Sequence, residues 1–246
     1  MSMIEEQQAV YVLNRRPYQE SSLLVDVFSL NFGRLTLIAK GALRKGSAWS
    51  ALLQPFQALL LSWSGRSSIK TLRSVDVPSQ PYKLRANYLF SAYYLNELVL
   101  KLVPDNEPSL GVFSNYVDCL DQLAEGQDLQ RCLRKFEYLL LSELGLLPDF
   151  EHDIYGHKIQ KDQGYKFLSQ QGFEGVGKAS SNLGSVFIIS GKAISLISTL
   201  DIVNGSTWQK EEYLKAKQLM RYLVDDALGG QVIKSRELFR PIKFKG

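Results

Sequence analysis

The first eighty residues contain five short runs rich in Val, Leu, Ile and Thr, and this pattern restricts the fold more than any other. The runs are residues 9–18, 22–28, 33–41, 55–64 and 67–77. Several of them alternate apolar and polar residues, as half-buried β-strands do. Turn-forming residues separate them, and residues 42–54 after the third run could form a short helix. Five strands interrupted after the third predict a small closed barrel of the OB type, while another small barrel or a hairpin sheet would share the same periodicity.

From Pro81 onward the apolar residues recur at helical spacing. This spacing predicts helices over residues 83–103, 109–126, 129–145, 191–200 and 208–230. Between the third and fourth helices, residues 148–185 are rich in glycine and form either hairpins or a long loop. The predicted fold class is therefore α+β. An N-terminal five-stranded OB-fold β-barrel over residues 1–80 precedes a mainly α-helical bundle over residues 81–246, with an irregular central insertion at about 148–185.

Composition excludes several classes of protein. The two cysteines, Cys119 and Cys132, can make neither a disulfide framework nor a four-ligand zinc site. No apolar run is long enough to span a bilayer, and the acidic start "MSMIEEQQAV" is unlike a secretory signal. We therefore expect a cytoplasmic protein with no membrane partner.

Positive charge is concentrated in the predicted barrel, beyond what the net charge of +4 indicates. Between Val27 and Val75 there is no Asp or Glu. A segment with charge of one sign attracts phosphates, so nucleic acid is the expected partner. The candidate phosphate contacts are Arg34, Lys40, Arg44, Lys45, Lys70 and Arg73. Aromatic residues lie among these bases, and Trp49 is a candidate for base stacking, although most aromatic residues of a small barrel belong to its core.

A smaller basic cluster lies on the helix predicted over residues 129–145. Arg131, Arg134 and Lys135 have the i, i+3, i+4 spacing of one helix face. Such a cluster is either a solvated helix face or the basic rim of a groove for an acidic peptide with apolar anchors.

Motifs for catalysis, metal or cofactor are weak. "GFEGVGKA" at residues 172–179 resembles a phosphate-binding loop, but Ala179 replaces the required Ser or Thr. His152, Asp153 and His157 have the chemistry of metal ligands without a zinc spacing. Carboxylates are scattered and lie away from the basic segment, which argues against a nuclease. We expect no catalytic residues, no metal and no cofactor.

Several stretches together resemble the RecO family of bacterial recombination mediators over nearly the whole chain. They are "VLNRRPYQESSLLVDVFS", "GRLTLIAKGALRK", "LLQPFQALLLSWSGR", "IKTLRS", "YYLNEL", "LRKFEYLLLSELG" and "KSRELFR". The order and spacing of these stretches make the resemblance specific.

The resemblance implies a non-enzymatic protein of DNA repair and recombination in the RecF pathway, associated with the nucleoid. It implies binding to single- and double-stranded DNA, annealing of complementary strands and a partnership with RecR. It also implies help in loading RecA onto DNA coated by single-stranded DNA-binding protein, whose acidic C-terminal tail such proteins bind. Arg134 in "LRKFE" lies where the resemblance places a tail-binding arginine.

The sequence departs from the family in one respect. Many RecO proteins carry a four-cysteine zinc module in the central region, whereas Asp153 and Gly156 stand at the first two of those positions here and the second pair is also missing. Zinc is therefore not expected. The strand pattern and the basic charge alone also fit an RNA-binding OB-fold factor, because no feature of the sequence distinguishes RNA from DNA by its 2′-hydroxyl.

Overall fold

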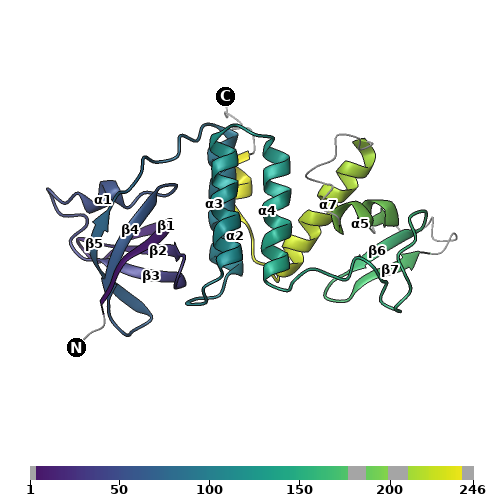
Figure 1. The fold of residues 1–246 in the computed structure, drawn as a ribbon, viewed down its shortest axis with the longest axis horizontal. Helices are drawn as coiled ribbons and strands as arrows, with labels where there is room; N and C mark the ends of the chain where they lie inside the picture. Colours follow the sequence, from purple (N-terminus) through teal and green to yellow (C-terminus); the bar gives the residue numbers. More distant parts are fainter. Residues whose placement is uncertain (1–3, 177–186, 199–209, 240–246) are drawn as a thin grey trace, which may run out of the picture. The chain divides into compact units, whose positions relative to one another are not determined.

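Five strands close into a barrel in the computed structural model, which describes residues 4–176, 187–198 and 210–239 (Figure 1). The strands are β1 (Ile4–Tyr18), β2 (Ser22–Ser29), β3 (Gly33–Ala39), β4 (Ala58–Ser64) and β5 (Ile69–Asp76). Their order around the barrel is β1–β2–β3–β5–β4, and β4 pairs with β1 to close it. Only the β3–β5 pair is parallel. The closed barrel confirms the OB-type prediction and excludes a hairpin sheet.

The barrel interior follows from the alternation of the sequence. In β3, the residues Leu35, Leu37 and Ala39 are buried, and the residues between them are half-buried. Because successive side chains of a strand point to opposite faces, one set fills the barrel and the other lies on its outer surface. The inward set of all five strands forms one apolar core that includes Trp63.

The connection between β3 and β4 contains a short helix, as the sequence allowed, and is otherwise mostly turn. Only α1 (Trp49–Leu52) is helical, and it has four residues. Gly41 and Gly46 have φ angles of +73° and +87°, a left-handed conformation that a right-handed helix cannot contain. Leu53 is fully buried, so this turn contributes to the barrel core.

Two helices, α2 (Asn87–Leu102) and α3 (Leu110–Ala124), follow the barrel and confirm the helical prediction for this region. Tyr11 of β1 and Phe28 of β2 contact Phe113 and Tyr116 of α3, with ring centroids between 5.3 and 6.0 Å apart. These aromatic pairs cover one part of the outer barrel surface with helix.

A buried asparagine joins α2 to an irregularity in β1. The register of β1 on β2 shifts between Val12 and Asn14, which leaves Leu13 as an extra residue. The Leu13 carbonyl accepts a hydrogen bond from Asn96 Nδ2 at 2.8 Å, and Asn96 Oδ1 accepts one from the Tyr116 hydroxyl at 2.7 Å. Asn96 therefore satisfies a backbone group that the barrel leaves without a strand partner.

The turn between β2 and β3 contacts the chain that follows α2. Arg34 Nε donates to the Val103 carbonyl at 2.9 Å, and Arg34 Nη2 lies 3.0 Å from the Asp105 carboxylate. Gly33 has a φ of +66°, and a Cβ atom there would lie within 3.0 Å of backbone atoms of Glu107. Only glycine permits this close approach of the two backbones.

The chain divides into two compact units that do not coincide with the predicted boundary at residue 80. Unit 1 comprises Met1–Leu129 and Ile233–Gly246, and unit 2 comprises Gln130–Val232. The chain returns to unit 1 through a 3₁₀ helix, η1 (Lys234–Phe239), which lies beside α2 (Figure 1).

Helix α2 holds η1 by a carboxylate. Glu97 Oε1 and Oε2 accept hydrogen bonds from the backbone N–H groups of Lys234 and Ser235, at 2.9 and 2.8 Å. The Arg236 guanidinium also lies over the Tyr94 ring, 5.7 Å from its centroid. We call this contact the C-terminal clasp.

Unit 2 combines helices with a small antiparallel sheet of order β7–β6–β8. Its elements are α4 (Leu129–Glu143), β6 (Gly164–Leu168), β7 (Gly172–Val176), β8 (Ile188–Ser190), α5 (Gly191–Ser198) and α7 (Lys210–Ala227). The helical predictions for these regions are confirmed within the described residues, and 199–200 and 208–209 lie outside them. The central insertion thus contains a hairpin, β6–β7, although residues 177–186 also lie outside the described part of the chain.

The motif "GFEGVGKA" does not form a phosphate-binding loop where it is described. Its first five residues are strand β7, paired with β6 along its length. The rest of the motif lies outside the described residues.

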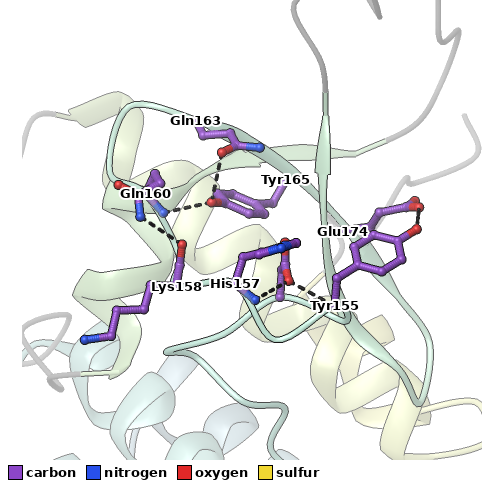
Figure 2. Close-up of polar contacts among 8 residues, drawn as sticks. Tyr155, His157, Lys158, Gln160, Gln163, Tyr165 and Glu174 are labelled. Carbon is purple, nitrogen blue, oxygen red and sulfur yellow. Dashed lines mark hydrogen bonds and ion pairs between the residues drawn. The ribbon is translucent and has the colours of Figure 1, made fainter.

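Polar contacts organise the turn that precedes this sheet, and Figure 2 shows those around Tyr155 and His157. Asp153 Oδ1 accepts hydrogen bonds from the backbone N–H groups of Tyr155 and His157, both at 2.9 Å. The Tyr155 hydroxyl donates to Glu174 of β7, which also pairs with Lys166 of β6. Burial alone would raise the pKa of Asp153, but these backbone hydrogen bonds outweigh it and lower the pKa.

The second aspartate of this turn is likewise engaged by neighbouring groups. Asp149 accepts hydrogen bonds from two backbone N–H groups, and its carboxylate lies 3.1 Å from His152 Nδ1. Within the described ranges, no group of three or more His, Cys, Asp or Glu side chains is arranged to hold a metal. In the same ranges, no helix combines the length and apolar character needed to cross a membrane.

Candidate nucleic-acid interface

The strand registers divide the outer surface of the barrel into a covered and an open part. Tyr11, Phe28 and Arg34 lie opposite one another across β1, β2 and β3, and this row lies under α3 and the loop after α2. Beyond it come two further rows across the same three strands. They are Asn14, Asp26 and Thr36, and then Arg16, Leu24 and Ile38.

Strand β5 extends these two rows, because it pairs with β3 in parallel. Ile69 lies opposite Thr36, and Thr71 lies opposite Ile38. Arg73 is the next outward residue of β5 and is exposed. Lys40 directly follows the last residue of β3 and is exposed. We call the outward residues of these rows the open face.

Two of the predicted phosphate contacts lie at the limits of the open face, Arg73 on β5 and Lys40 just past the end of β3. Both are exposed. Arg73 Nε donates to Ser64 Oγ at 2.7 Å, which fixes one side of its guanidinium to the neighbouring strand β4.

Arg44 and Lys45 lie in the turns between β3 and α1, and both are exposed. The aliphatic part of Arg44 approaches Gly41, and the Arg44 backbone N–H donates to the Gly41 carbonyl at 3.1 Å. These contacts hold the turn against the end of β3, next to Lys40. Arg44 and Lys45 therefore extend the basic surface beyond the strands.

The other two predicted contacts are placed differently. Arg34 belongs to the covered row, where it binds Val103 and Asp105 and joins the barrel to the loop after α2. Lys70 is half-buried and lies opposite Leu37, so it alternates with the outward residues Ile69 and Thr71. Neither residue lies on the open face.

Most of the aromatic residues among the bases are buried or pack against the core of the barrel. Trp63 and Phe28 are fully buried, and Phe56 is 5% exposed. Trp49 is half-buried and packs against the core, so it does not present a free ring for stacking. Tyr18, at the end of β1, is 38% exposed and is the next outward residue of that strand after Arg16.

Arg16 is the residue of the open face that sequence analysis missed. Its side chain is 51% exposed, and its Nη1 atom lies 2.6 Å from Asp26 Oδ2. Arg16 and Asp26 both precede the acid-free segment. A search for bases within that segment therefore does not find Arg16. The outward alternation of Asn14, Arg16 and Tyr18 is the signal that could have found it.

The basic cluster on α4 is less uniform than its spacing suggests. Arg131 is exposed and Lys135 is half-buried, but the side chain of Arg134 is only 9% exposed. Arg134 Nη2 lies 2.6 Å from the carboxylate of Glu137, whose side chain is fully buried. Arg134 thus neutralises a buried acid on its own helix.

Helix α7 adds two bases to this cluster that sequence analysis did not connect with it. Lys217 is half-buried, and its pKa is lowered first by burial and then by the positive charge of Arg134, with a smaller contribution from Arg221. Glu137 acts in the opposite direction. The effect of Arg134 on the Lys217 pKa links bases of α4 and α7 that about eighty residues separate in the chain.

A closed five-stranded barrel with a basic open face defines an OB-fold protein of the nucleic-acid-binding class. Two family models match the chain. The model described as "Recombination protein O N terminal" matches residues 1–80, and "Recombination protein O C terminal" matches residues 85–237. The chain belongs to the RecO family, which confirms the resemblance seen in the sequence.

Curated relatives agree over almost the whole chain. The protein named "DNA repair protein RecO" from Vibrio cholerae serotype O1 is 40% identical over 234 residues, which cover 95% of this chain and 93% of that protein. Its namesake from Aliivibrio salmonicida is 38% identical over 240 residues, 97% of each chain. The Haemophilus influenzae protein of that name is 36% identical over 238 residues, 96% of this chain and 97% of its own. The family places the chain in DNA repair and recombination.

Proposed function

We propose that this chain is a non-enzymatic recombination mediator of the RecF pathway that binds single- and double-stranded DNA and anneals complementary strands. One observation carries the proposal: the open face of the OB barrel is basic, in a chain of the RecO family. Lys40 and Arg73 on that face, with Arg44 and Lys45 beside it, contact phosphates. Arg34 and Lys70 support the barrel and contribute little to binding.

By this proposal the chain acts with RecR in the cytoplasm, on DNA of the nucleoid. It helps RecA replace single-stranded DNA-binding protein and uses no nucleotide, metal or other cofactor. Annealing requires a protein that binds both complementary strands. Electrostatic contacts with the phosphate backbone meet this requirement, because they do not depend on base sequence.

An annealing assay tests this function. Two complementary oligonucleotides carrying a fluorophore and a quencher are each coated with single-stranded DNA-binding protein, and the chain is added without nucleotide. Faster quenching than in the absence of the chain supports the mediator. Strand scission would indicate an enzyme instead, and preferential binding to structured RNA would indicate an RNA-binding OB-fold factor.

We further propose that the bases of α4 and α7 bind the acidic C-terminal tail of single-stranded DNA-binding protein. Arg131 and Lys135 line the accessible side of α4, and Lys217 adds a cation from α7. Arg134 is nearly buried behind these bases, where its guanidinium is paired with Glu137. A concentration of bases from two helices suits an acidic peptide.

A peptide titration tests this second proposal. A fluorescent acidic peptide that ends in Phe should bind the wild-type chain, and Arg134→Ala or Lys217→Gln should weaken that binding. Both should leave the affinity for free single-stranded DNA unchanged. Because Arg134→Ala also removes the ion pair with the buried Glu137, the Arg134→Lys variant, which keeps the charge, serves as its folded control. Unchanged peptide affinity in Lys217→Gln and Arg134→Ala would contradict the proposal.

A further inference from the structure

Asp26 is a buried carboxylate on the outer side of the barrel. It is 6% exposed, although its strand neighbours Asn14 and Arg16 are exposed. A buried carboxylate is unfavourable unless charged or hydrogen-bonding partners surround it. Asp26 is therefore stable in this position only if its contacts compensate for the loss of water.

Three donors from the two neighbouring strands surround Asp26. Its Oδ2 atom accepts from Arg16 Nη1 at 2.6 Å and from Asn14 Nδ2 at 3.2 Å, and its Oδ1 atom accepts from Thr36 Oγ1 at 2.8 Å. Asn14 and Thr36 lie directly opposite Asp26, on β1 and β3. Arg16 is the diagonal neighbour, two residues further along β1, within reach of a long side chain.

This arrangement fixes the arginine and leaves it accessible. Asn14 and Thr36 hold the carboxylate from both sides, so its position no longer depends on Arg16. The carboxylate in turn holds Nη1 of a guanidinium whose side chain remains 51% exposed. A guanidinium has five N–H donors, and those not used by Asp26 can bind a phosphate in the paired geometry that arginine offers.

The surroundings of Arg16 suit a nucleic-acid strand. Tyr18 is its outward neighbour on β1 and is 38% exposed, and Ile38 and Thr71 continue its row across β3 and β5. Aromatic and apolar groups contact bases in single strands, and cations contact phosphates. Arg16 and Arg73 lie on opposite sides of this neutral strip.

We propose that Arg16 is a phosphate-binding residue of the open face and that Asp26 is the residue that positions it. The ligand is the phosphodiester backbone of a single strand that crosses β1, β2, β3 and β5. The proposal rests on the DNA-binding function proposed above. An arginine already held in place loses little conformational freedom when the strand binds.

Two substitutions separate positioning from simple neutralisation. Asp26→Asn raises the net charge of the open face by one. If Asp26 only offsets the charge of Arg16, this variant binds a fluorescent oligo-dT more tightly. If Asp26 positions Arg16, the variant binds more weakly in spite of the added positive charge, by about threefold to tenfold, the scale of one ordinary hydrogen bond.

A matched control uses Glu20, an exposed acid in the turn between β1 and β2. Glu20→Gln makes the same change of charge without touching Arg16, so its affinity should equal or slightly exceed that of the wild type. Arg16→Gln should weaken binding and reduce the slope of log affinity against log salt by about 0.7, the value for one phosphate contact in single-stranded DNA.

The outcomes distinguish this proposal from the function on which it rests. If the wild-type chain does not bind oligo-dT with a salt-dependent affinity, the DNA-binding function itself fails. If the wild type binds but Arg16→Gln matches it in affinity and slope, only the role of Arg16 fails. Tighter binding by Asp26→Asn overturns the positioning role. Should that variant not fold, Arg16→Lys replaces it, since it keeps the charge, lacks the planar fork and is expected to bind more weakly.

Discussion

At the scale of single residues, buried polar groups join elements that are distant in the sequence. Asn96 connects the bulge at Leu13 with Tyr116, so three segments of unit 1 depend on one amide. Asp26 does the same for β1 and β3 on the open face. In both cases hydrogen bonds satisfy the polar atoms of a side chain whose burial would otherwise be unfavourable.

The Asn96→Ala variant should lower the free energy of unfolding by about 2–4 kcal/mol, because it leaves the Leu13 carbonyl and the Tyr116 hydroxyl buried without their partner. Chemical denaturation measures this change. Ser114→Ala, on an exposed position of α3, provides the control and should change stability by less than about 0.5 kcal/mol. A loss in Asn96→Ala no larger than in the control would show that water replaces the amide.

None of these residue pairs could be predicted from the sequence. The strand alternation gives the outward and inward faces of β1 and β2, but the pairing of Arg16 with Asp26 depends on the register between them. That register includes the bulge at Leu13, which has no signature in the residue types. The same reason explains why Lys217 was not linked with Arg134, since only tertiary packing brings them together.

At the scale of elements, sequence periodicity predicted most helices and all five barrel strands. Within residues 42–54 it indicated a short helix but not its bounds, because glycines with positive φ at positions 41 and 46 restrict the helix to α1. It also gave no sign of the C-terminal clasp, because η1 is short and its N-terminal N–H groups are satisfied by Glu97, far away in the chain. Short elements of this kind depend on tertiary contacts rather than on local pattern.

The clasp should weaken in acid. Burial alone would raise the pKa of Glu97, but hydrogen bonds from the backbone N–H groups of Ser235 and Lys234, with Lys101 nearby, lower it below the usual value of 4.5. A depressed folded-state pKa stabilises the fold above the unfolded-state pKa, and this contribution is lost as the pH falls through the folded-state pKa. Glu97→Gln should therefore be less stable than the wild type at pH 7, with a smaller difference near pH 3.

Denaturant titrations at both pH values measure this effect. Glu237→Gln, an exposed substitution on η1 itself, is the control for the change of charge. A difference between Glu97→Gln and the wild type that stays constant from pH 7 to pH 3 would show that the carboxylate does not hold the clasp by its charge.

At the scale of the whole molecule, the distribution of charge indicates the partner. The acid-free segment from Val27 to Val75 was visible in the sequence, and the structure places four of its bases on or beside the open face. The sequence alone could not exclude Arg34 and Lys70 from the predicted phosphate contacts, because burial and pairing are properties of the folded barrel.

Charge reversal in the connector should weaken DNA binding without altering sequence preference. The double variant Arg44→Glu, Lys45→Glu should bind oligonucleotides of different sequence more weakly by similar factors, since phosphate contacts carry no sequence information. Its salt slope should fall by about 0.7 for each single-strand phosphate that the variant no longer neutralises. Fluorescence anisotropy at several salt concentrations gives both quantities.

The control reverses two exposed bases of unit 2, Lys158 and Lys161, to Glu. This variant changes the net charge by the same amount, so it measures the general electrostatic effect. Equal reductions of affinity in the two variants would show that binding responds to total charge and not to the barrel surface.

The return of η1 to α2 has a consequence for the order in which the protein is made. Unit 1 contains the first 129 residues, yet its last helix is η1, at residues 234–239. On the ribosome, α2 therefore emerges long before the segment that binds Glu97. Until synthesis reaches Lys234 and Ser235, the Glu97 carboxylate has no backbone partner there, so unit 1 is completed only after the whole of unit 2 has been made.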